Sequence, residues 1–323
     1  MAGGIFGTNS IEEGTLTEEE TRRLLDLPAD SGVAEEERRA LNLKDAYQLA
    51  MITSATPDWR PDLDFVRALH AAITQGLTHP YNRPGQWRDN PKTILTHVGD
   101  AAHGGRYKPP QHGGDILALM GELLAWHGRL AEAEVPVLIR APLVHLYLER
   151  IHPFWDGNGR VGRVLEASLL LAAGFDYCPL GLSRFYFEHL DPYFTLFNRC
   201  RKAEESGEAA ANTAFVSFHL EGMLATINRL HDRVNRLLGD RLLLAEIDRL
   251  LRDKAINARQ HAILDQLREA SRPPTLAELR RSPWYLALYA RLADKTKQHD
   301  LRALRERGLL RLNEVGRLRP VHP

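Results

Sequence analysis

The feature that most constrains this chain is a polar segment, residues 152–163, that lies between two apolar runs. The segment reads His-Pro-Phe-Trp-Asp-Gly-Asn-Gly-Arg-Val-Gly-Arg. The flanking runs 141–151 and 164–173 are rich in Ala, Val, Leu and Ile, as expected of buried helices. Glycines within the segment permit backbone angles that other residues avoid. The sequence therefore predicts two buried helices joined by a loop, with the second helix beginning at the glycines.

The side chains of this segment have the chemistry of a phosphate site. A helix N-terminus preceded by glycines presents backbone N–H groups and a positive dipole end to an anion. Asp156 offers the oxygen ligands that Mg²⁺ prefers. Arg160 and Arg163 lie three residues apart, so on a helix they share a face and can both reach phosphate oxygens. His152 is a base that works near neutral pH, so the pattern predicts a phosphate site with a proton acceptor beside it.

Taken singly, these fragments are ordinary, since Gly-Asn-Gly is a common turn and a lone His at a helix end is usually a packed core residue. The whole string resembles the signature of the Fic family: His-Pro-Phe, one variable residue, Asp or Glu, Gly-Asn-Gly-Arg, two variable residues, Arg. Every fixed position is present. The resemblance implies a mainly α-helical Fic fold with a small β-hairpin flap. It also implies transfer of AMP from ATP, with Mg²⁺, to a Ser, Thr or Tyr hydroxyl of a protein or of the chain itself.

The resemblance assigns a role to each motif residue. By matching position, His152 is expected to deprotonate the target hydroxyl, and Asp156 to hold the Mg²⁺ that bridges the α- and β-phosphates. Arg160 is expected to support the β-phosphate and Arg163 to meet the γ-phosphate. The anion hole is expected to comprise Gly157, Asn158 and Gly159.

Aromatic residues follow the motif and give a candidate for the nucleotide base. The family usually places a Tyr-Tyr pair there, and Tyr193-Phe194 occupies that place with Phe instead of the second Tyr. Asn198 is a weaker candidate. The alternative is that these side chains belong to an aromatic core.

The N-terminal segment resembles the inhibitory motif of many Fic proteins, which is Ser or Thr, three variable residues, Glu, then Gly or Asn. Thr8 and Glu12 fit this frame, while Glu13 stands where Gly or Asn is usual. The match implies that Glu12 pairs with Arg163 and occupies the γ-phosphate site, because a carboxylate and a phosphate compete for one guanidinium. The alternative is a pair of solvated acids before a helix, whose start is predicted at Thr17 by a capping box.

Residues 81–111 form the least helical part of the chain, with several Pro and Gly turn signals. Residues 92–98 alternate enough to predict a short strand. The region resembles the Fic flap, which pairs with the target by strand addition. An ordinary surface loop is the alternative. The expected target-docking residues are Thr93, Ile94, Leu95, Thr96, His97 and Val98.

From Leu243 onward the chain has 17 Lys and Arg against 10 Asp and Glu. Short helices followed by two short strands resemble a winged helix-turn-helix. Such a module could place Gln298, His299 and Arg302 near a DNA groove, with Arg317 and Arg319 on phosphates. The alternative is a module for protein docking or for a homodimer. The modest and dispersed charge favours docking over DNA.

Composition sets the remaining expectations. The chain has 323 residues, zero formal net charge, 44% hydrophobic and 26% charged residues, as in an ordinary globular protein. We expect three parts, 1–58 with the inhibitory motif, 59–242 as catalytic core and 243–323 as winged-helix-like domain. No apolar run is long enough for a membrane span, and no secretory signal is apparent. Cys178 and Cys200 are expected to be free thiols, which favours the cytoplasm.

Three other functions remain open. One is hydrolytic removal of AMP, with Glu12 aligning a water molecule. Another is transfer of UMP or of a different phosphate-containing group. The third is a regulatory protein that binds DNA or a partner through the C-terminal part.

Overall fold

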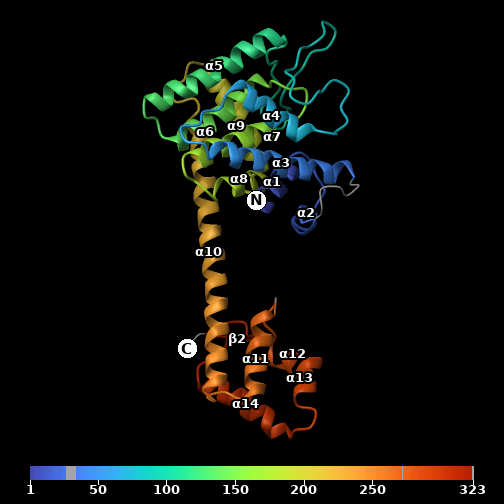
Figure 1. Cartoon of the computed structure of the whole chain (residues 1–323), viewed down its shortest axis with the longest axis vertical. Coiled ribbons are helices and arrows are strands. Elements are labelled where there is room, and N and C mark those ends of the chain that lie inside the picture. The colour runs from blue at the N-terminus through green and yellow to red at the C-terminus, as the bar shows by residue number, and fades with distance from the viewer. Residues whose placement is uncertain (27–33, 271, 322–323) are drawn as a thin grey trace. The chain divides into compact units, whose positions relative to one another are not determined.

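The computed structural model describes residues 1–26, 34–270 and 272–321, and these are mainly helical, which confirms the predicted fold class. The chain divides into two compact units, Met1–Asn228 and Arg229–Pro323 (Figure 1). The division falls within helix α10 (Thr213–Arg252). Within the described ranges, no helix combines the length and the apolar character that crossing a membrane requires.

The first unit is a helical bundle built around α7. This helix packs against α1, α3, α4, α6 and α8, and nearly all of its residues are buried. Figure 1 shows α6 and α7 among the other helices of the unit. Besides the first part of α10, the helices are α1 (Ala2–Ile11), α2 (Glu18–Leu25), α3 (Glu35–Ser54), α4 (Leu63–Thr74), α5 (Gly113–Glu132), α6 (Val137–Ile151), α7 (Asn158–Ala172), α8 (Pro179–Glu188) and α9 (Leu190–Glu205).

Local sequence explains several helix starts. Thr17 and Glu20 form the predicted capping box at α2. Asp62 caps α4 by accepting a hydrogen bond from the backbone N–H of Phe65 at 2.7 Å. Helix α1 has no side-chain cap, and it packs most extensively on α8. The position of α1 therefore depends on tertiary packing.

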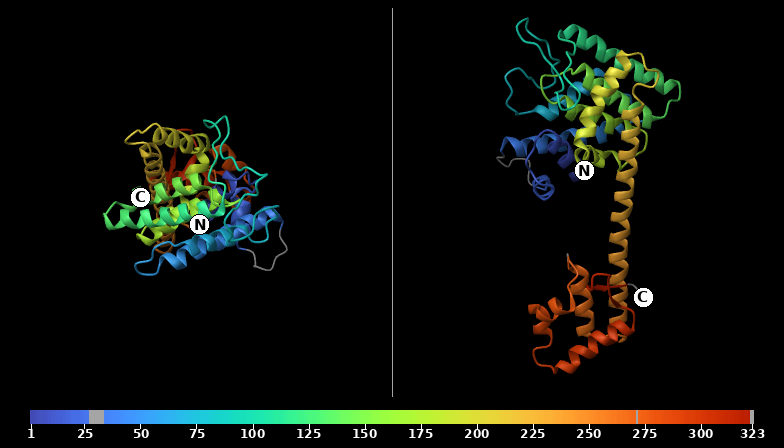
Figure 2. Two further views of the ribbon diagram at one scale, coloured as in Figure 1. Left: turned by 90° about the horizontal axis from the view of Figure 1, so that it is seen from above. Right: turned by 180° about the vertical axis from the view of Figure 1, so that it is seen from behind.

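The flap region projects from the helices as loops, drawn in teal in Figure 2. The strand predicted over residues 92–98 is wrong: the backbone there forms only an isolated antiparallel bridge between Val98 and Tyr107. The reason is that side chains take the backbone groups. The Nδ2 atom of Asn90 donates to the carbonyl of Ile94 at 3.1 Å, and the Oε1 atom of Gln111 accepts from the N–H of Thr96 at 2.8 Å.

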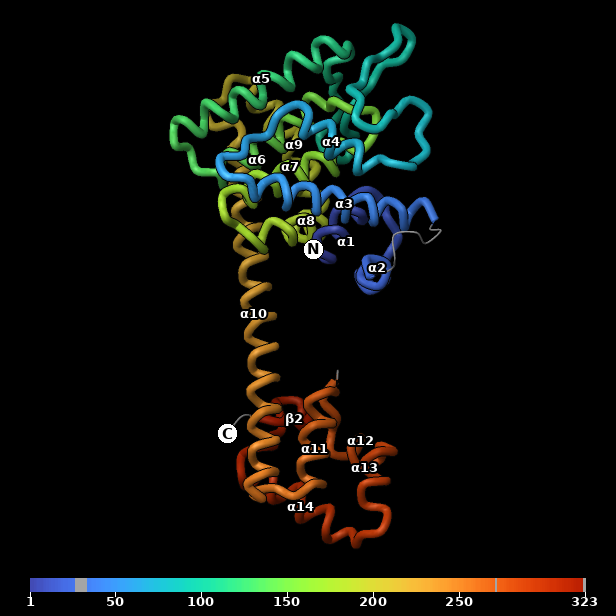
Figure 3. Tube along the Cα trace, in the orientation of Figure 1, coloured from blue at the N-terminus to red at the C-terminus, as the bar shows by residue number. Residues whose placement is uncertain are grey.

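After the end of α10, the described residues of the second unit form four short helices and a hairpin (Figure 3). Buried Asp300 links the start of one of these helices and the end of another to its own by accepting hydrogen bonds from Asn257, Arg259, Gln260 and Tyr289. The predicted order of helices followed by two short strands is present. The elements are α11 (Ala258–Glu269), α12 (Leu276–Arg281), α13 (Pro283–Leu288), α14 (Asp294–Glu306), β1 (Leu310–Leu312) and β2 (Leu318–Pro320), with β1 antiparallel to β2.

Candidate active site

The loop between α6 and α7 begins at His152, which ends α6 in a left-handed conformation with φ 51°. Such a conformation is costly for a residue other than glycine, so surrounding contacts must hold it. Arg88, fully buried, donates through Nη2 to the carbonyl of His152 at 2.9 Å and to that of Pro110 at 2.7 Å. The backbone N–H of Arg88 donates to the carbonyl of Pro153 at 2.8 Å. Arg88 therefore fixes the loop that carries His152.

A second clamp closes the same loop. The side chain of Asn158 accepts from the N–H of Phe154 and donates to its carbonyl, both at 2.9 Å. Phe154 is fully buried and stacks on His70, whose Nε2 lies 3.2 Å from the carbonyl oxygen of Asp156. Gly157 has φ 81° and precedes α7, where a side chain would press on α4. The Asn158 side chain thus shapes the loop, and its backbone begins the helix.

A cavity of about 620 Å³ opens at this loop. The residues expected to act as general base, metal ligand, anion hole and γ-phosphate arginine all line it. The N-terminal segment, the end of the flap and α9 complete its walls. Arg160 and flap residues 93–97 do not line it. The predicted site residues that line it are Glu12, Val98, His152, Asp156, Gly157, Asn158, Gly159, Arg163, Tyr193, Phe194 and the weaker candidate Asn198.

His152 has the protonation state that a general base needs. Burial lowers the pKa of its ring to about 4, and the charge of Arg88 adds to the effect. The ring is therefore neutral at pH 7 and able to accept a proton. Glu149, one helical turn earlier, has a carboxylate oxygen 3.8 Å from the Nδ1 atom of His152. Burial raises the pKa of Glu149 to about 8, so this carboxyl is mainly protonated at neutral pH.

Asp156 lies at the edge of the cavity and pairs with Arg160, whose Nη2 atom is 2.8 Å from both carboxylate oxygens. Burial opposes ionisation, but Arg160 and the N–H of Gly157 hold the pKa of Asp156 below its usual value. In the described ranges, no group of three or more potential metal ligands converges. Mg²⁺ normally takes one or two carboxylates and completes its shell with phosphates and water. A single Asp156 fits an ion of that kind.

Glu12 ends α1, and its Oε1 atom lies 2.5 Å from the Nη2 atom of Arg163. The contact expected from the resemblance is therefore present. Gly159 leaves room for it, because a Cβ atom there would lie 2.6 Å from that carboxylate oxygen. Glu13, the residue that departs from the family pattern, has φ 64°. This is the left-handed conformation that Gly and Asn tolerate best.

The candidate base-binding residues lie on α9. Tyr193 is buried, and its hydroxyl oxygen accepts a hydrogen bond from Arg163 at 3.3 Å, which places it near the end of the site that Glu12 occupies. The ring of Phe194 lies 5.4 Å from that of His103. Asn198 donates to the carbonyl of Gly105 at 2.8 Å and so ties the flap to α9.

Several residues that build the site were not predicted as functional. Arg88 and His70 lie far before the motif in the sequence, and no local pattern links them to it. Glu149 lies one helical turn before His152 on α6. The pair His145 and Glu166 is buried, with 3.1 Å between Nδ1 and Oε2, and it is connected to Arg163 through the hydroxyl of Tyr193. The sequence indicates His145 and Glu166 only as polar residues within otherwise apolar helical runs.

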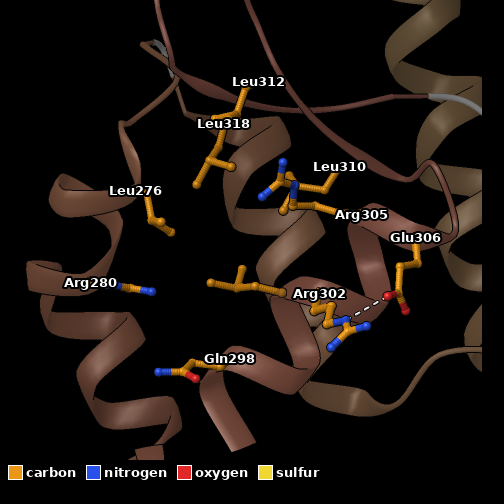
Figure 4. A pocket seen from close by; sticks show the side chains of 10 residues that line it. Leu276, Arg280, Gln298, Arg302, Arg305, Glu306, Leu310, Leu312 and Leu318 are labelled. Atoms are coloured by element: carbon orange, nitrogen blue, oxygen red, sulfur yellow. Dashed lines mark hydrogen bonds and ion pairs between the residues drawn. The ribbon is translucent and has the colours of Figure 1, made fainter. Parts of the chain in front are cut away.

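The second unit has its own cavity, of about 450 Å³, shown in Figure 4. Its floor is made by leucines, including Leu301, Leu310 and Leu318, and its rim carries Arg280 and Arg305. Among the described residues that line it there is neither a histidine nor a glycine, in contrast to the first cavity.

Comparisons with known proteins identify the domain. Residues 60–170 match the model of the Fic/DOC family. The protein adenylyltransferase Fic of Nematostella vectensis is 26% identical over 67% of this chain and 50% of its own length. The protein adenylyltransferase Fic of Drosophila ananassae is 28% identical over 53% of this chain and 32% of its own length. The chain thus spans at most half the length of these relatives.

Solved structures agree on the fold. A Fic family protein from Desulfovibrio desulfuricans has a TM-score of 0.56 at 19% identity, covering 100% of this chain and 86% of its own. A Fic-domain signaling protein from Bacteroides thetaiotaomicron has a TM-score of 0.58 at 20% identity, covering 70% and 84%. The chain therefore contains a Fic/DOC domain at residues 60–170, and these structures share its fold.

Proposed function

We propose that this protein transfers AMP from ATP to a hydroxyl group of a protein, the chain itself included, and that Glu12 restrains the reaction. The observation that carries the proposal is the convergence of His152, Asp156, the α7 N-terminus and Arg163 on one cavity. Relatives named protein adenylyltransferase support the same reaction class.

The proposed chemistry uses the groups of the cavity as follows. The target hydroxyl oxygen attacks the α-phosphorus of ATP, the bond from that phosphorus to the bridging oxygen breaks, and pyrophosphate leaves. His152 takes the hydroxyl proton, which its neutral ring can accept. The backbone N–H groups at the start of α7 and the guanidinium of Arg163 offset negative charge on the phosphates. A Mg²⁺ ion held by Asp156 would supply further charge stabilisation.

The proposed restraint follows from competition for Arg163. Its Nη2 atom is bound by Glu12, so a γ-phosphate would have to displace that carboxylate. The restraint is therefore a competition in which either the Glu12 carboxylate or the γ-phosphate of the nucleotide binds Arg163. Removal of the Glu12 carboxylate should raise transfer, and removal of Arg163 should abolish that gain.

The experiment is intact-protein mass spectrometry after incubation with ATP and Mg²⁺. We expect Glu12→Gly to gain one or more adenylyl groups, and Glu12→Gly with His152→Ala to gain none. Adenylylation that persists without His152 would defeat the assigned chemistry. Parallel reactions with UTP, and with a pre-adenylylated protein, distinguish UMP transfer and AMP removal from the proposed reaction.

The cavity of the second unit supports a second function, docking of a partner protein. An apolar floor with an arginine rim suits an amphipathic acidic segment, whereas DNA offers phosphates without aliphatic side chains. We expect the full chain to show no salt-sensitive mobility shift of duplex DNA. A shift that Arg302→Glu abolishes would favour DNA instead.

The proposed compartment is the cytoplasm. Both cysteines, Cys178 and Cys200, are buried and free, as predicted, and this agrees with a reducing environment.

A further inference from the structure

A chain of hydrogen bonds runs from the cavity into the interior of the first unit. The Nη1 atom of Arg163 donates to the hydroxyl oxygen of Tyr193 at 3.3 Å. The same hydroxyl lies 3.1 Å from the Nε2 atom of His145, and the Nδ1 atom of His145 lies 3.1 Å from the Oε2 atom of Glu166. All four side chains are at most 2% exposed. These side chains are therefore buried, and a buried polar group needs a hydrogen-bond partner.

The proton positions in this chain follow from the chemistry of its members. A guanidinium can only donate, so the Tyr193 oxygen accepts from Arg163 and its own proton is left for the Nε2 atom of His145. We assign the remaining ring proton of His145 to Nδ1, where it is donated to Glu166. Burial opposes ionisation of Glu166, but the contacts with His145 and His219 lower its pKa below the usual value. The bonds therefore all point one way, from the buried cation to a buried carboxylate, and each polarises the next.

The two ends of the Arg163 guanidinium have different kinds of partner. The Nη1 atom is bound by Tyr193 of α9, which α6 and α7 support through His145 and Glu166. The Nη2 atom is bound by Glu12, which belongs to α1 and is still 30% exposed. The first partner is part of the core, whereas the second can be displaced.

We propose that Tyr193 is the positioning residue for Arg163, holding the guanidinium toward the cavity whether Nη2 is bound by Glu12 or by the terminal phosphate of a nucleotide. This inference rests on the proposed ATP site. It gives Tyr193 a role through its hydroxyl, apart from the contact with the base that the resemblance implies. Loss of that hydroxyl should weaken nucleotide binding although the ring itself remains.

Tyr186 offers a matched control within the same cluster. Its ring stacks on that of Tyr193 with 4.8 Å between centroids and 15° between planes, and it is fully buried. Its hydroxyl donates to Glu166 at 3.0 Å, and its side chain does not line the cavity. Tyr186→Phe thus removes a buried phenol at similar structural cost without removing a bond to Arg163.

The experiment measures the Kd of Mg·ATP by calorimetry, together with KM and kcat for AMP transfer, in the Glu12→Gly protein. We expect Tyr193→Phe to raise Kd and KM about tenfold, the scale of one hydrogen bond to a charged group, with kcat changed less than about twofold. Tyr186→Phe should change Kd, KM and kcat by less than about twofold, while lowering the Tm about as much as Tyr193→Phe does. Equal increases of Kd in both variants would overturn the proposal.

A double variant separates positioning of Arg163 from any other role of the hydroxyl. In the Arg163→Ala background, Tyr193→Phe should cause no further loss of ATP affinity, because the partner is already gone. A further loss of similar size would show that the hydroxyl acts elsewhere and would overturn the proposal. If the Glu12→Gly protein binds ATP without transferring AMP, the proposed function fails and the Kd comparison still decides this inference. If it binds no ATP, both fail.

Discussion

A Cβ atom added to Gly4 would lie 1.9 Å from the backbone carbonyl oxygen of Leu180. The α1 helix therefore meets α8 backbone to backbone, and Gly7 makes the same close approach one turn later, at Ser183. No side chain fits at either point, and neither neighbour is a flexible group that could move aside. Glu12 follows the last residue of α1, so we expect this contact to help place the carboxylate at Arg163.

Gly4→Ala should displace α1 and so raise AMP transfer toward the level of Glu12→Gly. Gly3→Ala is the matched control, because the nearest atom to its added Cβ would be 3.8 Å away, on the Glu18 side chain. It makes the same chemical change in the same helix and should leave transfer within about twofold of the starting protein. Self-labelling with ATP tagged at the α-phosphate measures both. Equal labelling of the two alanine variants would contradict the proposed role of the contact.

Glu13→Gly should have the opposite effect to Glu12→Gly, although the two residues are adjacent. Glu13 has φ 64°, a conformation that costs an ordinary residue about 1 kcal/mol or more and glycine little. Relieving that strain should stabilise the end of α1 and reduce residual labelling about fivefold.

Glu13→Ala is the control for this prediction, since it removes the same carboxylate and retains the strain. Its residual labelling should equal that of the starting protein. If alanine reduces labelling as much as glycine, the charge of Glu13 is responsible and the backbone argument is wrong.

The motif was the part of the site that sequence could predict, because its residues are adjacent and the flanking runs define α6 and α7. The contact between Glu12 and Arg163 could be expected only from the family resemblance, since residue spacing alone says nothing about pairs 151 positions apart. The helix that carries Glu12 was not predicted. Its sequence, Ala-Gly-Gly-Ile-Phe-Gly-Thr-Asn-Ser-Ile, has poor helix formers, and packing on α8 outweighs their propensity.

The flap strand and Arg160 show where sequence reasoning ends. Alternation predicted a strand, but the side chains of Asn90 and Gln111 bind the backbone that a partner strand would have paired. Arg160, in the first turn of α7, pairs with the carboxylate of Asp156 in the preceding loop, and it does not line the cavity. Its Nε and Nη1 atoms have no partner within the described part of the chain. Whether Arg160 supports a β-phosphate stays a prediction.

Affinity for Mg·ATP should fall as pH rises through about 8, because Glu149 lines the cavity and burial raises its pKa to about 8. Below that pH the carboxyl is neutral; above it, a negative charge stands beside the phosphates. We expect the Kd of the Glu12→Gly protein to rise about tenfold as Glu149 ionises, at a somewhat lower pH than with Glu12 present, because the Glu12 charge contributes to the raised pKa. Glu149→Gln in the same background should give a flat profile. An identical rise in both proteins would place the titrating group elsewhere.

Target docking should depend on the backbone N–H of Leu95. Within the described ranges this group has no hydrogen-bond partner, and its side chain is 56% exposed, so an extended target segment could pair there. Leu95→Pro removes the N–H without breaking a bond of the free protein. In the Glu12→Gly background it should lower self-labelling about fivefold, the effect of one lost backbone bond, while the Kd of Mg·ATP stays unchanged. Leu95→Ala retains the N–H and should label normally. If Leu95→Ala lowers self-labelling as much as Leu95→Pro, the target recognises the exposed leucine side chain, and the strand-pairing argument is wrong.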